Sequence, residues 1–530
     1  MTEESFYLIW RNQYTRRLLR NLVCKEYIIN VKNNEYMIEN HQYLSLFTNR
    51  DKLDYNISIR FRGFYSDYVV IDKRNRYLID DVDIIVESDD VINLNEIHEG
   101  VHKLSFFISP ETTSATGKLP SSISYLRLCN QSYGDQPPYA QQILSNLPAN
   151  LQELVLGIQQ YSITSPCIMP ESLTDIKSDD TDTPLNYENL KWFVVPAIKV
   201  YQSCIVYIDS MESFEWLLVN KWICSVQIDS NVLNMNQLPS HVTHVVVNDD
   251  IVQDTSSFPQ TLESLFCCSG TPIPHFAHLK VLNIDGVHEL KLEKGVLPAS
   301  LQDLSLDYYH PLEVGVLPPH LTSLKLHYYN QPLCPNVLPP HLTTLHLPSY
   351  DQPLCPNDLP SSVTDLKLTS FNRPLDAYVL PQKLKRLHLY KFSQPVFPSH
   401  SLPVSLTHLI INGYNVSFDQ CQPLDNLKKL EIETLDPSLA ILLANVEKIH
   451  LLIDNREVSD PSSIAFLHNT SIRRLVLDFF SKITLYPNTF PPTLRHLTLA
   501  NAKLESGDVI PSGCVYLTKE MQENWEYRYR

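Results

Sequence analysis

One ten-residue pattern recurs along this chain at a nearly constant interval, and it limits the fold more than any other feature. The pattern is Leu-Pro, two variable residues, and then spaced apolar residues, as in LPQKLKRLHL from Leu380. Its copies follow each other every 20 to 22 residues and begin at Leu297, Leu317, Leu338, Leu359, Leu380 and Leu402. A fixed period of this length is typical of solenoids, in which each repeat forms one coil that stacks on the next.

Weaker copies extend the pattern over most of the sequence. They begin at Leu119, Leu147, Leu238 and Phe490. When only the L-x-x-L-x-L core is required, about nineteen coils fit between Val101 and Leu499. One interval, from Leu190 to Ile223, is long enough to predict an additional coil or an inserted segment.

The spacing of the leucines indicates a short strand in each coil. In LKRLHLY the side chains of Leu387 and Leu389 point to one face, and those of Arg386, His388 and Tyr390 to the other. A single coil cannot bury its leucine face, so successive strands must stack in parallel over a shared core. The predicted fold is therefore a β-rich solenoid, a leucine-rich-repeat-like right-handed array of coils of about 20–22 residues with a parallel strand ladder.

Proline has a defined place in such a coil. Pro381 directly precedes the strand, where its missing N–H does no harm to the ladder, and Pro374 lies in the preceding turn. The chain has 37 Pro and only 12 Gly. With such short connections, we expect extended chain or 3₁₀ turns on the side opposite the strands rather than full α-helices.

The amino-acid composition limits the kinds of binding partner and the cellular compartment that we expect for this protein. A net charge of −17 disfavours nucleic acid, because phosphate binding needs clustered Lys and Arg. No apolar run is long enough to span a bilayer, and the N-terminus does not resemble a secretory signal, so no membrane association is expected. The 11 Cys, without framework spacing, suit reduced thiols and predict a cytoplasmic location.

The residues between the strands carry a family resemblance. The group before Leu-Pro reads YNQPL from Tyr329, YDQPL from Tyr350 and FNRPL from Phe371. This resembles the FNIP repeat, a leucine-rich-repeat relative expanded in social amoebae and present in giant viruses of amoebae. The match is specific from about Leu297 to Val416 and diffuse from Val101 to Leu499. The resemblance implies a repeat scaffold without catalytic activity in the repeat itself, sometimes preceded by an F-box or a kinase domain.

The pattern predicts four segments. Residues 1–50 form an N-terminal helical cap or a degenerate F-box-like segment, and residues 51–100 a degenerate β cap or first coils. Residues 101–500 form the solenoid, most regular over 297–416, and residues 501–530 a C-terminal cap. A kinase domain is excluded because the glycine-rich loop and the H-R-D and D-F-G signatures are absent.

No residue cluster in the sequence indicates a catalytic, cofactor or metal site. Cys334 and Cys355 lie one period apart, which permits a redox or metal pair, but half-buried reduced thiols explain them more simply. His320 and His341 stack at one repeat position without the spacing of a zinc site. We therefore predict a protein that is not an enzyme and that has no cofactor.

The outward residues of the strands are the predicted binding site, since arrays of this kind usually bind through the concave sheet. These residues are Asp303, Asp307, Lys325, His327, His346, Asp365, Lys367, Arg386, His388 and Tyr390. Arg and Tyr are favoured in binding hot spots, so Arg386, His388 and Tyr390 come first. The alternative is a solvated polar face without a partner.

Two functions are consistent with this sequence. The first is a non-enzymatic scaffold that binds an unknown protein through the concave face. The second is a substrate-receptor subunit of a ubiquitin ligase, in which residues 1–50 bind an adaptor and the solenoid holds the substrate.

Overall fold

The computed structural model describes most of the chain. The described residues are 12–87, 91–108, 114–130, 139–157, 161, 163–180, 183–248, 251–252, 254–273, 276–286, 291–412, 416–433, 436–454 and 466–519. The chain forms two compact units, one of Met1–Asn248 with Ser256–Pro259 and one of Asp249–Thr255 with Gln260–Arg530. We call them unit 1 and unit 2.

Unit 1 begins with helices interleaved with its first strands. The helices are α2 (Gln13–Val23), α3 (Asn34–Leu44), α4 (Asn49–Tyr55), α5 (Tyr65–Val70) and α6 (Lys73–Arg76). The strands are β1 (Ile28–Val31) and β2 (Ser58–Phe64), which pair in parallel. Asn12, Asn33 and Thr48 cap the first three helices through side-chain oxygens, as short polar residues at helix N-termini do.

The rest of unit 1 is a series of parallel strands. One sheet has the order β1-β2-β3-β5-β7-β8-β10, in which the later members are β3 (Asp81–Val86), β5 (Lys103–Ile108), β7 (Tyr125–Asn130), β8 (Glu153–Leu156) and β10 (Asp175–Ser178). The strands that follow are β11 (Leu185–Asn186), β13 (Tyr201–Ile208), β14 (Ile223–Asp229) and β15 (His244–Asn248). Strand β13 is the additional coil predicted between Leu190 and Ile223.

Short elements lie on the connections of unit 1. Two small pairs join β4 (Ile92–Asn93) to β6 (Ala115–Thr116) and β9 (Cys167–Ile168) to β12 (Phe193–Val194). The helices here are α7 (Tyr139–Leu144), α8 (Tyr187–Leu190), α9 (Met211–Val219) and α10 (Ser230–Asn234). The expectation of extended connections was therefore wrong for this unit. The connections of unit 1 include short helices. Helix α9, for example, begins with a capping box between Ser210 and Ser213.

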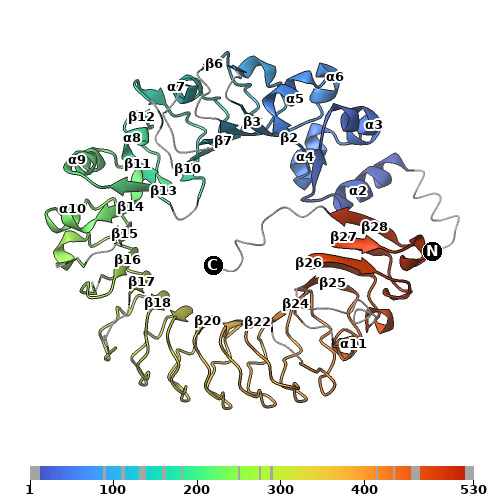
Figure 1. Ribbon diagram of the computed structural model, residues 1–530. Helices are drawn as coiled ribbons and strands as arrows, with labels where there is room; N and C mark the ends of the chain where they lie inside the picture. Colours follow the sequence, from blue (N-terminus) through green and yellow to red (C-terminus); the bar gives the residue numbers. More distant parts are fainter. Residues whose placement is uncertain are drawn as a thin grey trace. The chain divides into compact units, whose positions relative to one another are not determined.

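Unit 2 is a longer run of parallel strands in sequence order. They are β16 (Ser264–Cys268), β17 (Val281–Asp285), β18 (Asp303–Leu306), β19 (Ser323–Leu326), β20 (Thr344–His346), β21 (Asp365–Lys367), β22 (Arg386–Leu389), β23 (His408–Ile411), β24 (Lys429–Ile432), β25 (Lys448–Ile453), β26 (Arg474–Leu485), β27 (His496–Leu504) and β28 (Val515–Lys519). Figure 1 shows β18 to β24 on the inner, concave side of the arc formed by this unit. The fold is a β-rich, leucine-rich-repeat-like solenoid.

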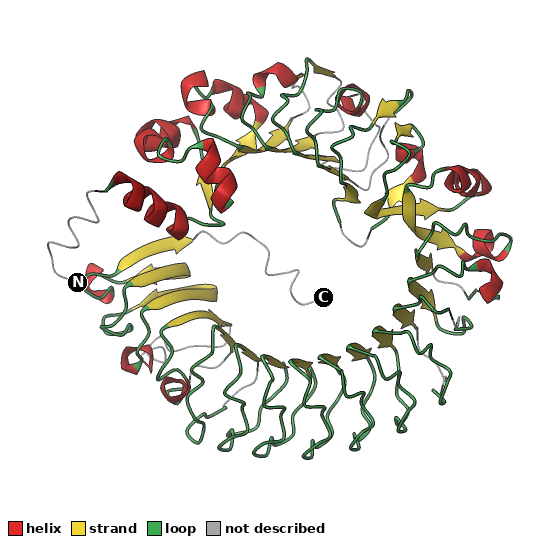
Figure 2. Ribbon diagram, turned by 180° about the vertical axis from the view of Figure 1, so that it is seen from behind, coloured by secondary structure: helices red, strands yellow, loops and turns green. Residues whose placement is uncertain are grey.

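Connections between the strands differ along unit 2. From β16 to β24 they contain turns and extended chain without an α-helix among the described residues, as the scarcity of Gly predicted. Figure 2 shows these connections as loops on the outer side. Helix α11 (Leu439–Leu442) follows β24, and single 3₁₀ turns occur at Leu94–Glu96, Thr255–Ser257 and Gly507–Val509.

The leucines of each coil fill the core, as their alternation predicted. Strands β18 and β19 alternate half-buried outward residues with buried leucines, and Leu387 and Leu389 of β22 are both fully buried. Pro381 lies at the corner before β22, where its carbonyl accepts a hydrogen bond from the N–H of Leu384 at 3.0 Å. The same turn recurs at Pro318, Pro339 and Pro360.

A second layer of the core is a stack of aromatic rings, one from each coil. Tyr308, Tyr329, Tyr350, Phe371 and Phe392 stack with ring centroids 6.3 to 6.5 Å apart and nearly parallel planes. The first residue of each FNRPL-type group is thus a core residue rather than a turn residue. Offset aromatic contacts of this kind add stability beyond the area that they bury.

The polar residue after each aromatic ring joins one coil to the next. Asn330 Oδ1 accepts a hydrogen bond from the N–H of Asp351, and Asp351 Oδ1 accepts one from the N–H of Asn372. Asn372 Oδ1 in turn accepts one from Ser393 N, each bond being 2.9 Å long. These bonds satisfy backbone donors that no strand covers, which explains why Asn or Asp recurs at this position.

Candidate functional site

Four strands place a row of nitrogen-bearing side chains on the concave face of unit 2. In the register of the sheet, Lys325 of β19 pairs with His346 of β20, and His346 pairs with Lys367 of β21. Lys367 in turn pairs with His388 of β22. We call these four residues the central row. Neighbouring parallel strands are about 4.8 Å apart, so each member flanks the next. All four are half-buried, because the flanking coils cover the lower part of each side chain.

Arg386 and Asp365 form an ion pair beside the central row. Arg386 Nε lies 2.7 Å from Asp365 Oδ2, across the gap between β21 and β22. The Arg386 side chain is 55% exposed while that of Asp365 is 14% exposed. The carboxylate therefore fixes the guanidinium in place at the surface, and Arg386 still has N–H groups that can reach a ligand.

The pKa values of both histidines of the central row are lowered. Burial is the main cause for His388, and together with the opposing charge of Asp365 and the repulsion from Lys367 it gives a pKa of about 4. The pKa of His346 is also lowered, first by burial and then by Lys367 and Lys325 against the opposing charge of Asp365. A neutral imidazole keeps one N–H donor and one acceptor, so these rings can bind a polar group.

The acidic members of the predicted site lie at the β18 end. Asp303 begins β18, and Asp307 directly follows that strand and accepts a hydrogen bond from Gly286 N at 3.2 Å. His327 follows β19, and its Nε2 lies 3.5 Å from Ser305 Oγ. Burial lowers the pKa of His327. The face is therefore acidic at β18 and rich in nitrogen donors from β19 to β22.

The structure brings the ten predicted residues onto one face. Tyr390 follows β22 and is half-buried, so it lies near one end of the group. Two further residues continue the face beyond the prediction, since Arg386 pairs in register with His408 and His408 with Lys429. Their signal was present in the sequence, because THL and KKL occupy the same repeat position as KRL.

The outward face of unit 1 differs from that of unit 2 in its cross-strand pairs of opposite charges, which were not predicted from the sequence. Its charged residues pair across neighbouring strands, as in Arg60 with Asp81 at 2.7 Å and Arg62 with Asp83 at 3.5 Å. Further pairs join Arg127 to Asp179 and Lys177 to Glu153. The signal was RFR in one coil and DVD in the next, at matching strand positions. These charges neutralise each other, which leaves fewer of them for a partner.

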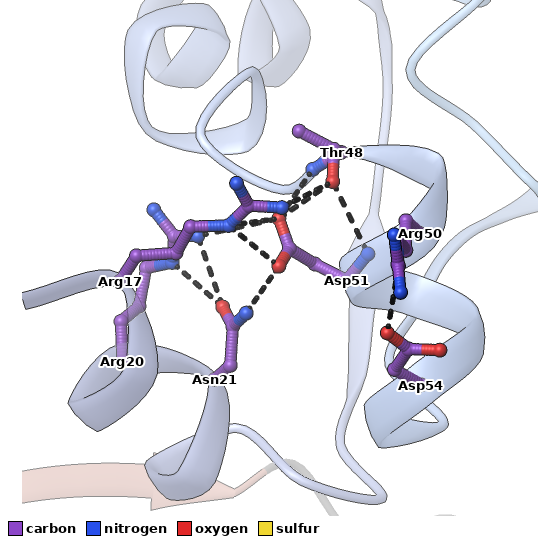
Figure 3. A network of polar contacts seen from close by, with 7 residues as sticks. All are labelled: Arg17, Arg20, Asn21, Thr48, Arg50, Asp51 and Asp54. Atoms are coloured by element: carbon purple, nitrogen blue, oxygen red, sulfur yellow. Dashed lines mark hydrogen bonds and ion pairs between the residues drawn. The ribbon is translucent and has the colours of Figure 1, made fainter. Parts of the chain in front are cut away.

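A polar network fixes helix α2, as Figure 3 shows. Arg17 of α2 bonds through Nε to Asp51 Oδ1 of α4 at 2.8 Å, and Asn21 of α2 bonds to the same carboxylate. Thr48 completes the network through a capping box with Asp51. Burial raises the pKa of Asp51, but the hydrogen bonds from Arg17, Thr48 and Asn21 outweigh it and lower that pKa to about 2.

Helix α2 is thus attached through its polar side. Asn21 is its buried residue, whereas the apolar side chains of Leu19, Leu22 and Val23 are 45%, 53% and 77% exposed. This arrangement is the reverse of an ordinary amphipathic helix, which buries its apolar side. The apolar surface of α2 could therefore contact another protein.

The thiols do not form a site with other ligands. All 11 cysteines are free, and Cys334 and Cys355 are exposed. Cys355 N donates to Asp358 Oδ2 at 2.6 Å, which ties that buried carboxylate to the local turn. Within the described residues no group of three His, Cys, Asp or Glu side chains could hold a metal ion. None of the described helices is long and apolar enough to cross a membrane.

Comparison with known families supports the repeat assignment. The FNIP Repeat model matches five overlapping segments, residues 288–329, 308–350, 329–370, 350–392 and 371–414. Four of the segments begin at a ring of the aromatic stack, namely Tyr308, Tyr329, Tyr350 and Phe371. No curated protein matches the chain.

Solved structures of leucine-rich-repeat proteins are distantly similar. A circular LRR protein, CroV588, is 20% identical with a TM-score of 0.38; the match covers 83% of this chain and 62% of CroV588. YopM from Yersinia enterocolitica is 17% identical with a TM-score of 0.30, over 83% of this chain and 87% of YopM. A chain of the mouse RP105/MD-1 complex is 13% identical with a TM-score of 0.30, over 82% of this chain and 89% of that one.

Proposed function

We propose that the solenoid, which the FNIP Repeat model matches over residues 288–414, is a non-enzymatic scaffold that binds another protein through the concave face of unit 2. The face consists of side chains held on successive short strands over a close-packed leucine core. Binding to such a surface costs little ordering entropy, because the backbone that presents the side chains is already fixed.

One observation supports this proposal above the others. Arg386 is exposed at the surface and yet is held by Asp365 at 2.7 Å, on the same strand as His388 and four residues before Tyr390. A pre-positioned arginine next to aromatic and imidazole rings is the composition found in binding hot spots. Free thiols support a reducing compartment such as the cytoplasm as the place of this interaction.

Affinity purification with mass spectrometry tests the proposal. The wild-type chain is compared with the variant R386A/H388A/Y390A and with the control Q382A/K383A, which changes exposed turn residues of the same coil. We expect the triple variant to lose a partner that the control retains, while both keep the wild-type circular dichroism spectrum. A partner list that is the same for all three chains would rule out this patch.

The exposed apolar side of α2 supports a second candidate, a substrate receptor of a ubiquitin ligase whose residues 1–50 bind an adaptor. Deletion of these residues would remove Arg17 and Asn21 and leave the buried Asp51 without its partners, so it cannot separate binding from folding. The variant L19Q/L22Q/V23Q removes the apolar surface and keeps the polar network.

The receptor function predicts that this variant folds normally and no longer co-purifies with a ligase adaptor. If residues 1–50 are only a cap, the variant and the wild type will have the same partners. In that case D51N, which breaks the network, should still destabilise the first helices.

A further inference from the structure

The two lysines of the central row are free cations. No hydrogen bond or ion pair joins the side chain of Lys325 or Lys367 to another residue in the part of the chain that the structure describes. The carboxylate nearest to Lys367 in sequence, Asp365, is already bound by Arg386. The two ammonium groups belong to strands that are two steps apart in the sheet, or about 10 Å.

The histidines of the row add donors without adding a partner for the lysines. His346 lies between Lys325 and Lys367 in the register, and His388 follows Lys367. Neither ring has a hydrogen bond to another described residue. From β19 to β22 the central row is therefore an uninterrupted series of four nitrogen-bearing side chains whose hydrogen-bonding capacity is unused.

This row contrasts with the charge of the molecule around it. The chain has a net charge of −17, and several outward charges of unit 1 are paired, as in Arg60 with Asp81. Lys429, farther along the same face of unit 2, has Glu431 within 3.7 Å. Half-buried ammonium groups without a counter-charge are costly, and a carboxylate from outside would relieve that cost.

We propose that the central row, Lys325, His346, Lys367 and His388, binds an acidic segment of the partner protein, with carboxylates on the two lysines and the histidine rings as additional hydrogen-bonding groups. This proposal rests on the proposed function and specifies the chemistry of the partner. The segment crosses the strands β19 to β22, and Arg386 borders it on one side.

A protein segment fits this row better than a nucleic acid does. Two free lysines can neutralise two negative charges, whereas nucleic acid presents a continuous line of phosphates and would meet a protein of net charge −17. Asp303 and Asp307, at the β18 end of the same face, would also repel a polyanion. A short segment with a few Asp or Glu residues can avoid them.

The test is selection of a phage-displayed library of random dodecapeptides on the full immobilised chain. We expect the selected peptides to be enriched in Asp and Glu relative to the unselected library. A selected peptide, measured by fluorescence anisotropy, should bind K325Q/K367Q at least about tenfold more weakly than wild type, because the variant lacks both charge-assisted hydrogen bonds from the lysines. The control K294Q/K383Q changes two exposed turn lysines and should bind like wild type.

Each of the remaining outcomes of this experiment would refute a specific part of the proposal. Peptides that depend on Arg386 but are not enriched in acids would refute the acidic segment and leave the concave binding face intact. Acidic peptides that bind K325Q/K367Q as tightly as wild type would place their site elsewhere. If no peptide is selected, or if a ten-residue oligothymidylate binds more tightly than the peptides do, the inference fails.

Discussion

At the scale of the residue, the position of a histidine on the strands of the solenoid shifts its pKa. His388 occurs between two buried leucines, and its ring lies among the side chains of neighbouring strands. Burial there lowers its pKa to about 4, well below the usual 6.5. The same cause acts on His346, two coils away. A repeat thus gives similar environments, and similar shifts, to residues at equivalent positions.

These shifts predict a loss of stability in mild acid. The unfolded chain binds protons at His388 below about pH 6.5, whereas the folded chain does so only near pH 4, so stability falls as the pH is lowered through this window. We expect H388Q to lose part of the difference in unfolding free energy between pH 7 and pH 5. Urea unfolding at pH 7 and at pH 5 measures this difference, and the control is H278Q, which changes an exposed histidine of unit 2. An unchanged difference in H388Q would contradict the prediction.

At the scale of the element, each coil depends on its neighbours through the aromatic stack and the Asn/Asp hydrogen bonds. Phe371 is fully buried between Tyr350 and Phe392, with centroids 6.3 Å away on both sides. The bonds from Asp351 to Asn372 and from Asn372 to Ser393 run beside the same rings. Removal of one ring therefore affects two interfaces between coils rather than one.

The stack predicts a large cost for a single truncation. Phe371→Ala should lower the free energy of unfolding by about 3–5 kcal/mol, because it leaves a cavity in a core that cannot collapse around it. Lys383→Ala, at an exposed turn position, should change it by less than about 0.5 kcal/mol. Chemical unfolding followed by circular dichroism compares the two. Equal effects would mean that the stack does not support the coils.

The first helices depend on one carboxylate in the same way. Asp51→Asn should loosen α2, because the buried Asp51 carboxylate accepts hydrogen bonds from Arg17, Asn21 and Thr48 (Figure 3). Asp54→Asn should leave α2 unchanged, because the ion pair of Asp54 with Arg50 is exposed to solvent. Hydrogen exchange of the α2 amides measures the difference. We expect faster exchange in D51N alone; equal exchange in both variants would refute the role of the network.

Much of the fold, and less of the site, could be predicted from the sequence. The alternation in LKRLHL was enough to predict that Leu387 is buried and that Arg386 faces outward. It could not predict that Arg386 is bound to Asp365, because that pair depends on which rotamers meet across two coils. Nor did the coil spacing reveal α9, since a helix and an extended connection can close coils of similar length.

At the scale of the whole molecule, the distribution of charge distinguishes the two units. Unit 1 pairs several outward charges across its strands, as in Arg62 with Asp83, while the concave face of unit 2 has Lys325 and Lys367 without a partner among the described residues. A solenoid gains stability from each added coil almost independently, so its outward residues are free to vary with function. The unpaired lysines are therefore the place to look for the partner.

Cross-linking of a captured complex tests the central claim most directly. An amine-reactive cross-linker followed by mass spectrometry identifies which lysines of the chain lie next to the partner. If the concave face of unit 2 is the binding surface, the cross-links will join the partner to Lys325 and Lys367 and not to Lys294 or Lys383, which are exposed in the turns. Cross-links that occur mainly at Lys294 and Lys383, with Lys325 and Lys367 unmodified by the partner, would contradict the account.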